Sequence, residues 1–196
     1  MAQEIGLTDA KGTRIALKSV HIDGSLNGPL ASMAITQRYC NDSGKKLEIV
    51  YTFPLAFGAT LLDMAVTLGG RRLQGAVVEK PQAWKKYEEA IDDGDAPVFV
   101  EQISHGLYTA NLGNIEPGED VVVELRYAQL LRVEQDRIRL SVPCVLAPRY
   151  GDPHKAGGLA PHESAASNIA AEYPLTIKIA LLGQIAKSEI HCPSHP

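Results

Sequence analysis

The sequence has few cysteines, no long apolar run and no apolar stretch near its N-terminus. Its 196 residues include three cysteines, Cys40, Cys144 and Cys192, which are odd in number and far apart. They do not provide a disulfide framework, and reduced thiols are the simplest interpretation. The N-terminal stretch MAQEIGLTDAKG lacks the apolar region of a secretory signal, and runs such as VFV are too short to span a bilayer. We therefore expect a soluble, cytoplasmic protein with no membrane partner.

An excess of positive charge is also absent. The 19 lysines and arginines are outnumbered by 23 aspartates and glutamates, which gives a net charge of -4, and the basic residues are scattered. Binding to nucleic acid depends largely on neutralising phosphates with cations, so this composition argues against a nucleic-acid partner. Hydrophobic residues make up 45% of the chain, an ordinary proportion for a globular domain with a sizeable core.

Recognisable catalytic motifs are missing as well. The sequence contains neither of the phosphate-binding patterns GxxxxGK[ST] and GxGxxG, and it has no GxSxG elbow and no HExxH. Ser104 and His105 are adjacent but fit a polar turn, and DDGD at 92–95 does not match the calcium-loop pattern. We therefore predict no catalytic residue, no cofactor and no enzymatic activity.

The C-terminal stretch IHCPSHP holds the candidates for a metal site, His191, Cys192 and His195. In an extended strand, His191 and Cys192 point to opposite faces, and Pro193 prevents a helix from bringing the two histidines together. The spacing therefore favours a strand end over a metal site. A metal-binding or hydrolytic domain that uses these histidines and the cysteine stays as the alternative interpretation.

Alternation of apolar and polar residues with a period of two dominates the chain and predicts strands joined by short turns. Gly69–Gly70 suits a hairpin turn with positive φ, and Pro117–Gly118 suits a type II turn. The fold class predicted is all-β, an antiparallel β-sandwich. The strands are expected over 14–26, 29–40, 47–55, 61–79 with its internal turn, 97–103, 107–113, 119–133 and 137–147.

One stretch has helical spacing instead of alternation. KPQAWKKYEEAIDDGD predicts a single inserted α-helix at about 81–93, in which Trp84 and Tyr87 lie on the apolar stripe. Pro81 suits the first helical turn, and Gly94 suits the position after the last turn. We expect Trp84 and Tyr87 to anchor this helix against the sandwich.

The C-terminal part is predicted to form a small-residue loop over 151–173 and then a β-hairpin over 174–196 that belongs to the same unit. In its first strand, 174–182, one face is wholly apolar. An unpaired edge with such a face can pair with another chain, so we predict that this chain self-associates through the hairpin when it is separated from its natural neighbour. The residues of the apolar face are Leu175, Ile177, Ile179 and Leu181.

Several stretches in order resemble a VIT domain, the module of vault poly(ADP-ribose) polymerase and the inter-alpha-trypsin inhibitor heavy chains. They are YTFPLAFGATLLDM at 51–64, GAVVEKPQAWKKYEEAIDDG at 75–94, LGNIEPGE at 112–119, VELRYAQLL at 123–131 and VPCVLAPRY at 142–150. The residues to which we assign a structural role in this motif are Tyr51, Phe53, Pro54, Glu79, Trp84, Tyr87, Gly94, Gly113, Asn114, Pro117, Gly118, Tyr127, Arg149 and Tyr150. Further positions that match are Tyr39, Asn41, Leu55, Ala83 and Pro148.

The resemblance implies a domain over residues 1–150, with its core at about 13–150, that is a non-catalytic interaction or scaffold module. In such proteins a von Willebrand factor type A domain typically follows, and its DxSxS adhesion motif is absent from this sequence. The resemblance therefore implies an N-terminal fragment of a larger protein. Its expected partners are proteins, first of all a downstream von Willebrand factor type A domain in the same chain.

Overall fold

The computed structural model describes residues 7–9, 14–75, 98–104, 106–143 and 173–193. These residues form strands and one short 3-10 helix, η2, so the predicted all-β class is confirmed. The elements are β1 (Leu7–Asp9), β2 (Arg14–Asn27), β3 (Leu30–Cys40), β4 (Leu47–Pro54), β5 (Ala59–Leu68), β6 (Arg71–Gln74), β7 (Val98–Ser104), β8 (Leu107–Ile115), β9 (Asp120–Leu130), β10 (Val133–Glu134), β11 (Arg137–Ile138), β12 (Leu175–Leu182) and η2 (Gly183–Lys187).

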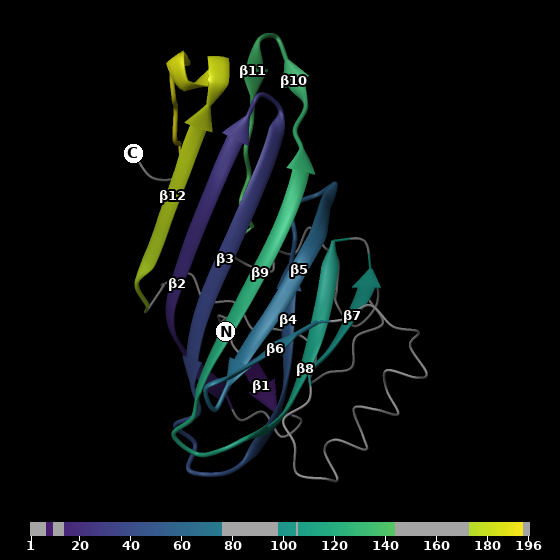
Figure 1. Ribbon diagram of the computed structural model, residues 1–196, viewed down its shortest axis with the longest axis vertical. Helices are drawn as coiled ribbons and strands as arrows, with labels where there is room; N and C mark the ends of the chain where they lie inside the picture. Colours follow the sequence, from purple (N-terminus) through teal and green to yellow (C-terminus); the bar gives the residue numbers. More distant parts are fainter. Residues whose placement is uncertain (1–6, 10–13, 76–97, 105, 144–172, 194–196) are drawn as a thin grey trace.

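The strands form two layers that β1 connects. The hydrogen-bonded order is β6-β5-β9-β3-β2-β1-β4-β8-β7, and β12 adds to β2 on the side away from β3. Figure 1 shows β12, β2, β3, β9 and β5 side by side as one broad layer. β1 pairs with both β2 and β4 and so joins this layer to the layer of β4, β8 and β7. Each of these pairs is antiparallel, except that of β12 with β2.

The main core lies between the two layers. In β3 and β9 the odd-numbered residues are largely buried and the even-numbered ones are more exposed, as the period of two predicts. Removing one such apolar side chain from water contributes about 1.5–3 kcal/mol. Side chains of both layers meet in this core, among them Ile22, Met33, Tyr39, Ile49, Tyr51, Phe53, Val66, Leu112, Val123 and Tyr127.

The predicted C-terminal hairpin over 174–196 is not formed, and this prediction was wrong. β12 runs parallel to β2, from Leu175 opposite Val20 to Leu182 opposite Asn27, and the chain then enters η2 instead of a returning strand. The part of β2 that lies beyond β1 offers an open edge, and pairing there satisfies the backbone groups of both strands. The period of two cannot distinguish these outcomes, because it shows which residues share a face but not which strand they pair with.

Gly24 shapes the contact between β12 and its neighbours. A Cβ atom at Gly24 would lie 2.5 Å from Sδ of Met33 and 2.7 Å from Cδ1 of Ile179. The missing side chain therefore leaves space in which Met33 of β3 and Ile179 of β12 pack above β2.

A second, smaller core lies at the end of the sheet where β2 and β12 finish. It centres on Leu26, Ala31 and Leu131. Partly buried side chains that pack against it come from segments far apart in the sequence, namely Ile138, Leu140, Ile179, Leu181 and Ile185. The strand predicted over 137–147 is short, since strand pairing covers only Arg137–Ile138. After it, Leu140 packs against the smaller core and Val142 against the main core.

Some predictions concern residues outside the described ranges. The helix at about 81–93 and residues 151–172 of the predicted loop 151–173 both lie there, as does the part of the predicted strand 137–147 that follows residue 143. Within the described residues, no helical segment is long and apolar enough to cross a lipid bilayer.

Candidate functional site

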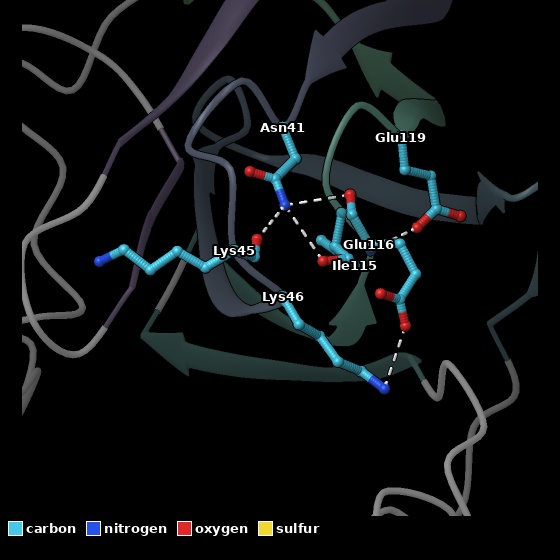
Figure 2. Close-up of polar contacts among 6 residues, drawn as sticks. All are labelled: Asn41, Lys45, Lys46, Ile115, Glu116 and Glu119. Carbon is cyan, nitrogen blue, oxygen red and sulfur yellow. Dashed lines mark hydrogen bonds and ion pairs between the residues drawn. The ribbon is translucent and has the colours of Figure 1, made fainter.

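Asn41, which follows directly after β3, makes hydrogen bonds to several distant parts of the chain. It is fully buried although it carries a polar amide. Its Nδ2 group donates hydrogen bonds to the carbonyl oxygens of Lys45 at 2.8 Å, Ile115 at 3.1 Å and Glu116 at 3.1 Å (Figure 2). Its Oδ1 atom accepts hydrogen bonds from the Ser43 backbone N–H at 3.2 Å and the Ser43 hydroxyl at 2.7 Å. The hydrogen-bonding groups of this buried amide therefore all have partners, which offsets the cost of removing them from water.

The backbone of Asn41 connects the same two loops. Its N–H donates to the carbonyl oxygen of Glu119 at 3.0 Å, and its own carbonyl accepts from the N–H of Gly118 at 2.7 Å. The loop between β3 and β4 is therefore fixed to the loop between β8 and β9 through both the side chain and the main chain of one residue. We call this arrangement of Asn41 with residues 115–119 the Asn41 clamp.

The turn inside the Asn41 clamp has the predicted chemistry. Gly118 has a φ of 76°, and the N–H of Glu119 donates to the carbonyl of Glu116 at 3.1 Å, as in a type II turn with Pro117 before the glycine. Asn114 precedes it with a φ of 55°, in the left-handed region that asparagine tolerates better than most residues. These motif positions therefore fix the path of the backbone.

Charged groups surround the Asn41 clamp on its solvent side. The Glu119 carboxylate accepts a hydrogen bond from the Glu116 N–H at 2.7 Å, and Lys46 forms a 3.2 Å ion pair with Glu116. Both side chains of that ion pair are about half exposed, so solvent screening keeps its contribution small. The arrangement orders two loops and does not direct a nucleophile or a general base toward a shared point.

A row of aromatic side chains runs from Tyr39 along β4 to Tyr108 of β8. Tyr51 stacks with Phe53 at a ring-centroid distance of 5.1 Å, Phe53 stacks with Tyr108 at 5.4 Å, and Tyr39 meets Tyr51 edge-on at 6.1 Å. The hydroxyls of Tyr39 and Tyr51 both donate to Oε1 of Gln37, the former at 2.9 Å. Burial raises the pKa of both phenols, so they are neutral hydrogen-bond donors at neutral pH.

The thiol of Cys40, at the end of β3, is not activated. Desolvation raises the pKa of Cys40, and a hydrogen bond with Asp120 raises it further. Because the thiolate is the reactive form, this environment disfavours a nucleophilic cysteine.

The candidates for a metal site are only partly within the described residues. His191 and Cys192 are exposed and follow η2 in a segment that is not a strand, while His195 lies outside the described ranges. In the described part of the chain, no group of three or more His, Cys, Asp and Glu residues is arranged to hold a metal ion. Because this segment is not a strand, the alternation that would place His191 and Cys192 on opposite faces does not apply to it.

The structure brings several motif residues together and leaves others undescribed. Tyr51, Phe53 and Tyr127 are buried in the main core, Gly113 is buried in β8, and Pro54 ends β4. Sequence reasoning missed the roles of Asn41 and Gln37, although the NDSG composition after β3 did indicate a turn. Motif residues outside the described ranges are Glu79, Trp84, Tyr87, Gly94, Arg149 and Tyr150.

A family model matches more than half of the chain. Residues 17–127 match the family described as the vault protein inter-alpha-trypsin domain. The chain is 31% identical over 153 residues to von Willebrand factor A domain-containing protein 5A of Rattus norvegicus, covering 76% of this chain and 19% of that protein. It is 29% identical over 147 residues to protein mono-ADP-ribosyltransferase PARP4 of Homo sapiens, covering 75% of this chain and 8% of that protein. The chain therefore spans less than a quarter of the length of either relative.

A solved structure also aligns, at a lower level of similarity. An M1 zinc metallopeptidase from Deinococcus radiodurans matches with a TM-score of 0.32 and 14% identity, covering 67% of this chain and 22% of that one. Similarity of this degree carries no argument about function.

Proposed function

Because this chain belongs to the vault protein inter-alpha-trypsin (VIT) domain family, we propose that it is a non-catalytic protein-interaction module of a larger protein. The observation that carries the proposal is the position of its motif residues. Tyr51, Phe53 and Tyr127 are in the core, while Asn114 and Gly118 shape the loops. Residues used for packing and turns support a stable platform, whose binding function would lie on its outer surfaces.

The proposed neighbour is a von Willebrand factor type A domain in the same polypeptide. Two features support it: the name of the rat relative states that it contains such a domain, and this chain corresponds to only 19% of that relative. In this proposal the module holds the type A domain in place or presents it to other proteins. The small number of cysteines supports a cytoplasmic location, which belongs to this proposal.

The test begins with the coding sequence downstream of Pro196. We expect it to encode a von Willebrand factor type A domain with a DxSxS motif. A domain of another kind at this position would overturn the proposed neighbour. The encoded type A domain can then be added to the isotope-labelled 196-residue chain while NMR spectra of the chain are recorded. We expect changes in the chemical shifts of surface residues, whereas unchanged spectra at high concentration would argue against the interaction.

The metal-binding or hydrolytic alternative is tested separately. Metal analysis of the purified chain is compared with that of the His191→Ala/His195→Ala variant. Stoichiometric zinc that is lost in the variant would favour the alternative and contradict the proposal. We expect no difference between the two proteins.

A further inference from the structure

The outer face of the broad layer carries a row of exposed leucines at one end. In register across four strands, Leu182 of β12 lies opposite Asn27 of β2, Asn27 opposite Leu30 of β3, and Leu30 opposite Leu130 of β9. The exposed fractions are 45% for Leu182, 47% for Leu30 and 73% for Leu130. With neighbouring strands about 4.8 Å apart, the row extends over roughly 14 Å. These three leucines thus share one register line at the end of the layer where β12 and β9 finish. Figure 1 shows the ends of β12 and β9 at the same end of the layer.

Two further exposed apolar side chains come from the segments next to this end of β9. Val133, at the start of β10, is 58% exposed and follows shortly after β9, and Phe57, in the loop before β5, is 79% exposed. Nε2 of Gln129 donates to the carbonyl oxygen of Phe57 at 2.8 Å, which holds that loop against the end of β9. We call these five residues, Leu30, Phe57, Leu130, Val133 and Leu182, the apolar end. Exposed apolar groups that gather in this way on a soluble domain typically mark an interaction site.

The apolar end rests on an ordered base. Leu131, next to Leu130, is buried in the smaller core with Leu26 and Ala31, and its N–H donates to the carbonyl oxygen of Pro29 at 2.8 Å. Ile138 of β11 and Ile185 of η2 pack against the same core. The β10–β11 hairpin is therefore fixed to the sheet, and a partner would meet a surface that needs little ordering on binding.

A hollow of about 840 Å³ with several guanidinium groups adjoins the apolar end. Its lining includes Leu130 together with Arg132, Arg137 and Arg139, and one carboxylate, that of Glu134. All three arginines are exposed, and none of the described residues forms an ion pair with them. On a chain with a net charge of -4, this is a local excess of positive charge beside exposed apolar side chains. Arginines in this setting can bind carboxylates with two parallel hydrogen bonds.

We infer that the apolar end and its arginines dock an acidic segment of a partner protein, one that alternates carboxylates with apolar side chains. The carboxylates would bind Arg132, Arg137 and Arg139, and the apolar side chains would cover Leu130 and its neighbours. A protein segment fits better than nucleic acid, since the exposed apolar side chains of the apolar end would not contact phosphates. This inference rests on the proposed function, because it names a surface and a partner chemistry for the interaction module.

The experiment measures binding of short fluorescent peptides to the 196-residue chain by fluorescence anisotropy. The probe is a synthetic peptide of alternating Glu and Leu, and the comparison peptides alternate Lys with Leu or Glu with Ser. We expect the Glu-Leu peptide to bind at least tenfold more tightly than either comparison peptide, and its affinity to fall as salt screens the arginines. Equal binding of the Lys-Leu peptide, or no binding of any peptide, would overturn the inference.

Variants locate the site. Arg132→Gln/Arg137→Gln/Arg139→Gln and Leu130→Ser/Val133→Ser should each weaken binding at least tenfold, with circular dichroism and the melting temperature showing that the fold is retained. The matched controls are Arg38→Gln, an exposed arginine near the opposite end of β3, and Ile190→Ser, an exposed isoleucine after η2. Both controls should stay within twofold of the original chain. Equal losses in the controls, or no loss in the site variants, would place the binding elsewhere.

Two further measurements separate this inference from its competitors. The first measures binding to vesicles of anionic phospholipid and to single-stranded DNA. If the peptide does not bind but one of these does, and the arginine variant loses that binding, the surface belongs to a membrane or to nucleic acid instead. If the peptide fails but the type A domain still binds the chain, then this inference fails and the proposed function stands.

Discussion

Asn41 shows how one polar side chain can hold two distant loops together. It joins the turn after β3 to carbonyl groups that are 74 and 75 positions further along the chain. Each buried carbonyl that loses its donor costs on the order of 1–3 kcal/mol, far more than the net value of an ordinary exposed hydrogen bond. The stability of both loops therefore depends on the amide of a single residue.

Asn41→Ala should lower the free energy of unfolding by about 2–4 kcal/mol, because it leaves several carbonyl groups without a donor. Chemical denaturation of the two proteins measures the difference. Ser43→Ala is the matched control: it removes one partly buried donor to Oδ1 of Asn41, which keeps the Ser43 N–H, and it should cost less than about 1 kcal/mol. A loss below about 0.5 kcal/mol for Asn41→Ala, typical of a surface position, would contradict the clamp.

Asn41→Asp tests the direction of the same hydrogen bonds. The aspartate keeps an acceptor for Ser43 but turns a carboxylate oxygen toward carbonyl groups, which should raise the pKa of that carboxyl in the folded state above its unfolded value of about 3.9. The destabilisation relative to Asn41→Ala should therefore be smallest below about pH 4 and grow as the pH rises toward neutrality. A difference between these two variants that does not change with pH would show that the amide does not donate.

The buried tyrosines predict a loss of stability in alkaline solution. Burial raises the pKa of Tyr39 and Tyr51 in the folded protein, whereas in the unfolded chain both ionise near pH 10. Their contribution to stability is therefore complete below about pH 10 and is lost as the pH rises above it. Phenolate absorbance should show these two groups ionising together with unfolding, and Tyr51→Phe should make the alkaline loss shallower. Ionisation of all seven tyrosines near pH 10 without unfolding would contradict the burial.

At the scale of the elements, Gly24 predicts a coupling between β2 and β12. Gly24→Ala should cost about 1–2 kcal/mol, because the added methyl group meets Met33 and Ile179 inside van der Waals contact. Ile179→Val removes the Cδ1 atom that this methyl group would strike. The double variant Gly24→Ala/Ile179→Val should therefore be more stable than the sum of the single effects predicts, as a double-mutant cycle measures. Strict additivity would show that β12 does not pack over Gly24.

The turns and strands could be predicted from the sequence because their signals are local. Gly69 and Gly70 have φ values of 54° and 76°, as the primed hairpin turn requires, and Gly118 takes the positive φ of its type II turn. The partner of β12 could not be predicted, because parallel and antiparallel strands share the same alternation. Its pairing depends on space above Gly24 and on the smaller core, both of which involve residues distant in the sequence. The Asn41 clamp escaped prediction for the same reason, since a turn composition does not reveal distant acceptors.

At the scale of the whole molecule, β12 adds to the outer side of β2, and no other strand among the described residues pairs with β12. The self-association predicted from the sequence assumed an open edge on a hairpin. The hairpin is not formed, but the edge of β12 that faces away from β2 is open among the described strands. Leu175 and Ile177 lie on the apolar face of β12 and remain more than one third exposed. Edges of this kind tend to pair with strands of other molecules.

We therefore keep the prediction that the isolated chain self-associates at high concentration by strand addition at β12. Light scattering on the chain alone and on the chain fused to the proposed type A domain should show a larger species for the former. Ala180→Lys, which places a charge on the exposed face of β12, should shift the chain toward the monomer. A chain that is monomeric at all concentrations would refute the prediction.

The parallel pairing of β12 with β2 also determines how this domain would respond to tension. A pulling force applied at the start of β2 and at the end of β12 acts along the two strands in opposite directions. The hydrogen bonds over the register from Leu175–Val20 to Leu182–Asn27 would then be loaded in shear and at the same time. In a terminal hairpin, the same force would open the bonds one after another from the free end. The pairing of β12 with β2 should therefore resist a force applied between the start of β2 and the end of β12 far better than a terminal hairpin would.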